Sequence, residues 1–203
     1  MSDFSDIIFC FKPSHVTWDD IHDLLWKAHE RNRAAGMNML YPSLPGDELE
    51  KVVGAEGRCF VAIKDGKLVG TCSYKPVRRN MWYDKGQVSA YFILEAVSPE
   101  YEGKGIYARL CKLREEDAIK RGFRLFEMDT AERNYHSQTI LKNNGFRHVF
   151  FRPYKTGGIY AVHMAKWVGK SPFPKWYCKG MFLLRKVYAK VRFKPGYIKR
   201  FGI

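Results

Sequence analysis

Blocks of apolar residues with two different periodicities predict alternating strands and helices along the first part of the chain. Residues 6–11 form a short apolar run and are expected to be a strand. Thr17 and Asp20 have the spacing of a helix N-cap and its third residue, and apolar positions at helical spacing extend the predicted helix to about Gly36. A second, short helix is expected at about residues 48–53.

A hairpin, a long strand and a helix are predicted in the middle of the chain. The strands are expected at residues 59–63, 68–74 and 88–97, and the helix at residues 106–120. Asp65 and Gly66 separate the first two strands, and this dipeptide readily supplies the positive φ angles of a tight turn. The apolar side of the predicted helix includes Leu110, Leu113 and Ala118.

The remaining elements complete a mixed α/β domain. A strand is expected at residues 125–128, a helix at 135–143, and two strands at 148–153 and 158–164. Asn144 and Gly145 follow the helix as a typical C-terminal cap. The order of elements predicts one domain over residues 1–166, with an extension over residues 167–203.

Composition and charge narrow the class of protein. With 203 residues, 46% of them hydrophobic, the chain can bury a core, which excludes a disordered polycation. The net charge of +14 is unevenly placed, because Glu132 is the last acidic residue and 16 basic residues follow it. Residues 1–132 carry 19 basic and 21 acidic residues, so this part of the chain does not have the charge of a nucleic-acid-binding protein.

Targeting signals and cysteine spacing indicate the compartment. No stretch of 18 apolar residues occurs, and the first residues carry acids where an export signal would carry Lys or Arg, so a cytoplasmic protein is expected. The five cysteines are an odd number without a C-x-x-C pair. They are expected to be reduced thiols, and no metal site is predicted.

The turn between the strand at 88–97 and the helix at 106–120 is the first candidate site. Gly103 and Gly105 let the main chain fold tightly, so that amides up to Tyr107 can converge at the positive end of the helix. This arrangement suits an anion such as a pyrophosphate. On spacing alone, an ordinary turn with two glycines is an equal alternative.

Motifs around this turn resemble those of the GNAT (GCN5-related N-acetyltransferase) superfamily. The run V-S-P-E-Y-E-G-K-G-I-Y-A-R-L is followed by N-x-x-S-x-x-I-L-x-x-N-G-F from Asn134 to Phe146, and by a closing strand with V-H-M. The resemblance covers about residues 58–166. It implies a GNAT-like fold, with a mixed, mostly antiparallel sheet flanked by helices, and acetyl-CoA as the acyl donor.

The resemblance also implies which residues bind the donor. The turn of the family reads Arg/Gln-x-x-Gly-x-Gly/Ala, whereas this chain has Glu102 at the first position and Tyr107 at the last. Leu141 stands where the family often carries a tyrosine that protonates the leaving thiolate. The residues expected to bind acetyl-CoA are Ala96, Val97, Gly103, Lys104, Gly105, Ile106, Tyr107 and Asn134.

Three residues are candidates for proton transfer. Glu95 interrupts an apolar strand and is expected to share a face with Tyr91 and Ile93, either as the base that deprotonates an amine or in a salt bridge with a basic neighbour. Asp129 is a second candidate base, with helix capping as its alternative. Tyr135 is a candidate acid, as is His136 beside it, but at most one of the two can face the site.

The extension combines aromatic and basic residues. Trp176, Leu183, Leu184, Val187 and Val191 recur at helical spacing between residues 175 and 194. Such a helix suits an anionic surface at the inner face of a membrane, packing back on the domain, or a homodimer. Nucleic acid or an acyl carrier protein has less weight among these alternatives.

These observations predict an N-acetyltransferase. It would move an acetyl group from acetyl-CoA to a primary amine of a small molecule or sugar precursor, by direct attack in a ternary complex. The alternative is a catalytically degenerate acyl-CoA-binding module that docks on a membrane or nucleic acid through its basic tail.

Overall fold

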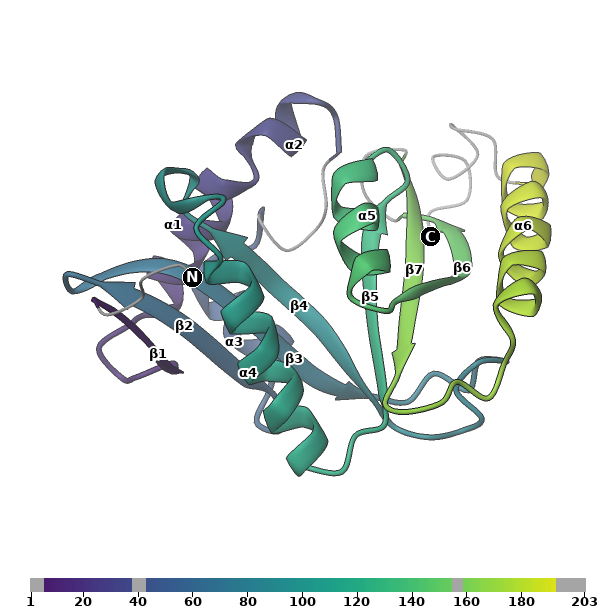
Figure 1. Ribbon diagram of the computed structural model, residues 1–203. Coiled ribbons are helices and arrows are strands. Elements are labelled where there is room, and N and C mark those ends of the chain that lie inside the picture. Colours follow the sequence, from purple (N-terminus) through teal and green to yellow (C-terminus); the bar gives the residue numbers. More distant parts are fainter. Residues whose placement is uncertain (1–5, 38–42, 155–158, 193–203) are drawn as a thin grey trace. The chain divides into compact units, whose positions relative to one another are not determined.

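The computed structural model describes residues 6–37, 43–154 and 159–192, which fold as two compact units. The N-terminal unit consists of residues 1–31, 40–77 and 90–123, and the C-terminal unit of residues 32–39, 78–89 and 124–203. Figure 1 shows the helices and strands of both.

Four strands lie in sequence order in the N-terminal unit. They are β1 (Ile7–Phe11), β2 (Arg58–Lys64), β3 (Lys67–Val77) and β4 (Ser89–Val97). β1 pairs with β2, and β2 with β3, in antiparallel register. Asp65 and Gly66 have φ angles of 49° and 74°, which confirms the predicted tight turn of the hairpin.

Helices cover both faces of these strands (Figure 1). α1 (Trp18–Ala28) and α3 (Gly46–Val53) bury Ile21, Leu25 and Leu49 against Val61 and Ile63 of β2. The predicted N-cap is confirmed, because Thr17 and Asp20 bond each other's main-chain amides as a capping box.

The first predicted helix is too long. α1 ends at Ala28, where His29 leaves helical geometry, and a separate short helix α2 (Glu30–Ala34) follows. The N–H of His29 points to the carbonyls of Leu25 and Lys27, so the last turn is closed there instead of at Gly36.

The opposite face of β2 and β3 receives α4 (Ile106–Lys120), whose bounds match the predicted ones. A side chain at Gly70 of β3 would bring its Cβ to 2.9 Å from Leu110 and 3.0 Å from Ile106, so this glycine lets the helix approach the sheet. The buried stripe of α4 is Ile106, Leu110, Arg114 and Ala118. Leu113, predicted on the apolar side of this helix, is half-buried beside the stripe, in which Arg114 occupies a core position.

The C-terminal unit contains β5 (Leu125–Ala131), β6 (Arg147–Pro153) and β7 (Tyr160–Trp167) in the spatial order β5-β7-β6. Both pairs of neighbours are antiparallel. α5 (Tyr135–Asn143) ends at Asn144, and the positive φ of 90° at Gly145 completes the expected cap. The predicted start of the last strand at Gly158 lies outside the described residues.

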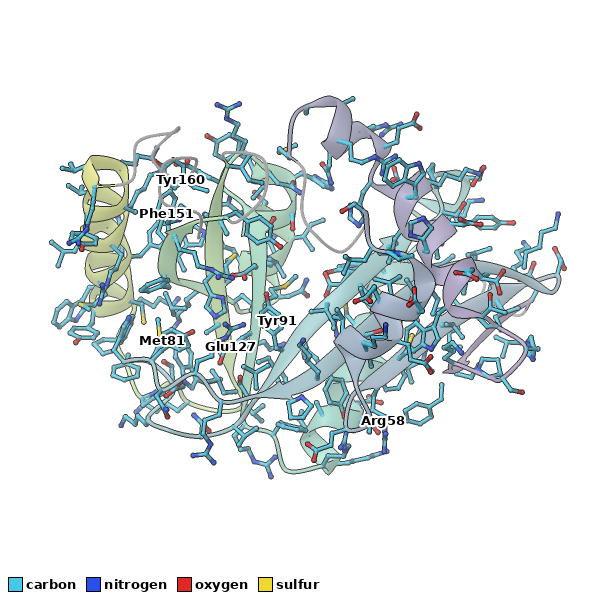
Figure 2. The ribbon with its side chains drawn as sticks, turned by 180° about the vertical axis from the view of Figure 1, so that it is seen from behind. Arg58, Met81, Tyr91, Glu127, Phe151 and Tyr160 are labelled. Atoms are coloured by element: carbon cyan, nitrogen blue, oxygen red, sulfur yellow. The ribbon has the colours of Figure 1, made fainter. Side chains whose placement is uncertain are left out.

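α6 (Lys175–Arg192) packs against β6, so part of the extension belongs to the C-terminal unit. Phe182 of α6 lies with its ring centroid 4.6 Å from that of His148 and 5.9 Å from that of Phe151. Figure 2 shows Phe151 and Tyr160 beside this helix. The predicted end of the helix at Lys194 is outside the described residues, and no described helix is long and apolar enough to cross a bilayer.

The prediction of a mixed α/β fold with mostly antiparallel pairing and flanking helices is confirmed.

Candidate active site

The glycine turn before α4 has the geometry of an anion site. Gly103 and Gly105 adopt φ angles of 73° and 85°, both in the left-handed region, and Gly105 is the N-cap of the helix. No side chain caps the first turn of α4, so its main-chain amides are available to a ligand. Space around the α-carbon of Gly103 is open. These features fit the pyrophosphate of an acyl-CoA.

Charges around the turn partly compensate for Glu102. The carboxylate of Glu102 lies 3.8 Å from the guanidinium of Arg31, at the surface. Lys104 places its ammonium 4.7 Å from the ring centroid of Tyr101, on the 3₁₀ helix Pro99–Tyr101 that leads into the turn. The acid at the position where the family has Arg or Gln therefore has a basic neighbour, and Lys104 adds another positive charge.

β4 carries an irregularity just before Glu95. Leu94 has a φ of 54°, although it is not a glycine, and this left-handed residue breaks the alternation of side chains along the strand. Tyr91, Ile93, Leu94 and Ala96 all join the core with α1 and α3. Glu95 instead faces α4, so the prediction that it shares a face with Tyr91 and Ile93 is wrong.

The side chain of Glu95 is held by two residues of α4. Its Oε1 lies 2.5 Å from the guanidinium of Arg114, and Tyr107 donates its hydroxyl to Oε2 at 2.8 Å. The guanidinium of Arg114 also lies 3.7 Å from the ring centroid of Phe92, on the same face of β4. The salt bridge that the sequence left as an alternative is therefore present.

Burial changes the protonation of the groups around this pair. Burial opposes the charge of Arg114, but the Glu95 carboxylate outweighs it and raises the pKa of the guanidinium above its usual range. Burial, followed by the charge of Glu95, also raises the pKa of Tyr107 well above its usual value. Tyr107 therefore stays protonated, and its hydroxyl donates a hydrogen bond either to Glu95 or, in its place, to a ligand.

The main chain at the same place is bound from α1. A ring nitrogen of His29, at the end of α1, lies 2.9 Å from the carbonyl oxygen of Glu95. Ala96 is buried and Val97 is partly exposed. The end of β4 is thus braced by His29 on one side and by α4 on the other.

Candidate residues in the C-terminal unit occupy the start of α5. Asn134 is the N-cap of this helix and accepts a hydrogen bond from the amide of Ser137 at 3.1 Å, which leaves its NH₂ group as the part that can donate to a ligand. Tyr135 begins the helix and is 72% exposed. Leu141 is buried in the core. The helix-capping alternative for Asp129 is wrong, because Asn134 caps α5.

Asp129 belongs to an ionic cluster in which Glu127 and His163 are buried and Arg152 is partly exposed. The ring nitrogens of His163 lie 2.6 Å from Asp129 and 2.8 Å from Glu127, and Arg152 is 2.5 Å from Asp129. Burial opposes protonation of His163, but the two carboxylates outweigh it and raise its pKa. Burial acts to raise the pKa of Glu127, and His163 outweighs this effect and lowers it. Figure 2 labels Glu127 on β5.

Sequence reasoning missed Arg114 and His163. Arg114 stands on the buried side of α4 and His163 at an inward position of β7, and an acid stands in a neighbouring apolar strand in each case. A charge in such a strand requires a partner, so the acids Glu95 and Glu127 were the available signals.

Comparison with known proteins identifies the family. Residues 18–146, more than half of the chain, match the model of the Acetyltransferase (GNAT) family. The chain therefore belongs to the GNAT acetyltransferases, acyltransferases whose donor is acetyl-CoA. No curated protein sequence matches the chain.

Solved structures share this fold at low sequence identity. The ribosomal-protein-S18-alanine N-acetyltransferase of Escherichia coli superposes with a TM-score of 0.59 at 15% identity, over 83% of this chain and 99% of its own. A GNAT acetyltransferase of Elizabethkingia anophelis, solved with acetyl-CoA bound, gives 0.57 at 15% identity, over 80% and 99%. An acetyltransferase of Streptococcus agalactiae gives 0.61 at 16% identity, over 81% and 100%.

Proposed function

We propose that this chain is an N-acetyltransferase that transfers the acetyl group of acetyl-CoA to a primary amine of a small molecule or sugar precursor. The observation that carries the proposal is the uncapped start of α4, with left-handed Gly103 and Gly105 beside the irregular end of β4. Bound acetyl-CoA supplies an activated thioester. The amides around Gly103 to Tyr107 bind its pyrophosphate, and main-chain groups of Ala96 and Val97 orient its arm.

Transfer by direct attack in a ternary complex is supported by the state of the cysteines. All five thiols have pKa values raised by burial, and that of Cys111, on α4, is about 11. A thiolate is the nucleophilic form, so none of these cysteines is prepared to carry the acetyl group as an enzyme thioester. The raised pKa values therefore support attack by the amine itself.

Glu95 is the proposed base, directly or through water. Its carboxylate keeps some exposure, and Arg114 and Tyr107 fix its orientation. Asp129 is the second candidate, although His163 and Arg152 already bind it. Asn134 contacts the acyl-CoA arm, and Tyr135, which is exposed, is the candidate acid in place of the buried Leu141.

The test is a thiol-release assay with acetyl-CoA and a panel of amines that includes amino sugars. Glu95→Gln should lower the turnover number by about 10²-fold or more. It should also remove the part of the pH dependence of the rate that arises from a general base, whereas Asp129→Asn should leave that pH dependence in place. Thiol release with no amine in the panel, despite acetyl-CoA binding, would favour the degenerate binding module instead. Absence of acetyl-CoA binding would refute both.

A further inference from the structure

Helix α6 has two apolar stripes on opposite sides. Cys178, Phe182 and Ala189 form the inner stripe, which is buried against the C-terminal unit. The outer stripe consists of Trp176, Leu183, Leu184, Val187 and Val191, which are 74%, 49%, 69%, 64% and 73% exposed. Because consecutive helical residues are about 100° apart, the outer stripe is centred on the side opposite the inner one.

Packing among the residues that the structure describes does not account for the outer stripe. A helix that only covers β6 would carry polar residues on its far side. Five large apolar side chains are instead exposed on this side, and clusters of this kind mark interaction sites.

Salt bridges fix which side of α6 faces outward. Lys186 and Lys190 lie 2.9 Å and 2.8 Å from the carboxylate of Glu132, so the helix is tied to its unit along one edge. The ammonium of Lys190 also lies 5.8 Å from the ring centroids of Phe151 and Tyr160. These contacts, together with the buried Phe182, hold the outer stripe towards solvent.

Basic residues border the outer stripe on one side. Lys175 and Lys179 lie with Lys186 and Lys190 on this edge, whereas Arg185, 5.2 Å from the ring centroid of Phe150, and Arg192 lie closer to the inner stripe. No carboxylate follows Glu132 in the sequence, and Glu132 pairs with Lys186 and Lys190, so the charge that this edge offers to a ligand comes mainly from Lys175 and Lys179.

We infer that the outer stripe of α6 docks the protein on an anionic lipid surface. Apolar side chains would enter the boundary between headgroups and acyl chains, Trp176 would lie at the interface, and Lys175 and Lys179 of the basic edge would contact anionic headgroups. A second copy of the chain fits less well, because a two-fold axis would bring basic edges against each other. Nucleic acid would engage the charges but leave the apolar stripe in water.

Vesicle flotation of the full chain tests this inference. Binding is expected to phosphatidylcholine vesicles that contain phosphatidylglycerol and not to phosphatidylcholine alone. Leu184→Ser should weaken partitioning about tenfold. The matched control is Ile8→Ser on β1, because Ile8 is 63% exposed and Leu184 69%, and this control should bind as the unchanged protein does.

A second pair of variants separates local charge from net charge. Lys175→Gln with Lys179→Gln should weaken binding by about fivefold for each side chain removed. Lys67→Gln with Lys120→Gln removes the same charge from β3 and α4 and should leave binding unchanged.

Three outcomes would overturn the inference. The first is equal binding, or no binding, with anionic and neutral vesicles. The second is an equal effect in a variant and its matched control. The third is a lipid-free dimer, seen by light scattering, that Leu184→Ser converts to a monomer, because the outer stripe would then be an interface between two copies. Acetyl-CoA binding by the unchanged protein is measured in parallel. Failure to bind acetyl-CoA would count against the proposed function and not against docking on lipid.

Discussion

The pair formed by Glu95 and Arg114 should dominate the stability of the N-terminal unit. Glu95→Gln keeps the size of the side chain and the bond from Tyr107 but removes the charge opposite Arg114, whose side chain is 2% exposed. The other acceptors near the guanidinium, the carbonyl of Ser73 and the sulfur of Cys111, are both 3.5 Å away; the first is a long contact and the second a weak acceptor, and neither replaces the charge of a carboxylate.

The expected loss follows from burying one unpaired cation. Removing one partner of a buried ion pair costs about 3–5 kcal/mol, and the partial exposure of Glu95 places this variant near the lower end, at about 3 kcal/mol. For a chain of this length, that corresponds to a fall in Tm of about 6–12 °C. Replacing both residues, as Glu95→Gln with Arg114→Met, should recover most of the loss, since no charge is then left buried.

Urea unfolding of the two single variants and the double variant measures this coupling. The control is Glu116→Gln, because Glu116 lies 3.9 Å from Lys112 in an exposed pair on the same helix. This change should alter the free energy of unfolding by less than about 0.5 kcal/mol. If Glu95→Gln has as small an effect as the control, or if the double variant is no more stable than the sum of the single changes predicts, the pair does not hold α4 on β4.

Two further predictions concern packing and pH. Gly70→Ala should lower the free energy of unfolding by about 1–3 kcal/mol in urea titrations, because its Cβ would lie 2.9 Å from Leu110. An unchanged free energy of unfolding would mean that α4 can move away from β3 without loss of stability. Because the pKa of His163 is raised, the imidazole stays protonated in the folded state at pH values where the imidazole of the unfolded chain has already lost its proton. Stability should therefore fall as pH rises from about 6.5 through the raised pKa. His163→Gln should remove this fall, and an equal slope in both proteins would contradict the assignment.

Local signals in the sequence predicted most element boundaries. The bounds of α4 follow from the glycines at both ends, and the start of α1 from the reciprocal bonds of Thr17 and Asp20. The end of α1 was missed because the residues after Ala28 keep good helix formers, so that only the geometry at His29 shows the break. The bounds of regular helices with clear caps can therefore be predicted from the sequence alone.

The irregularity in β4 was not predictable from residue types. Leu94 takes a left-handed conformation that leucine normally avoids, and it reverses the faces of Glu95 and its neighbours. The two stripes of α6 show a related limit. Apolar spacing identified the outer stripe, but Cys178, Phe182 and Ala189 form the side that packs on the unit. Charge and periodicity locate such a helix without deciding which side it buries.

The central claim is that the turn at the start of α4 binds acetyl-CoA through its main chain, and titration calorimetry with a matched glycine pair tests it most directly. Gly103 and Gly122 lie at opposite ends of α4, have φ angles of 73° and 91°, and both have open space around the α-carbon. Replacing either glycine by Ala should lower the free energy of unfolding by a similar amount, about 1–2 kcal/mol, because both positions are left-handed. Gly103→Ala should weaken acetyl-CoA binding about tenfold or more, and Gly122→Ala should not. Equal affinities in the two variants would contradict the account.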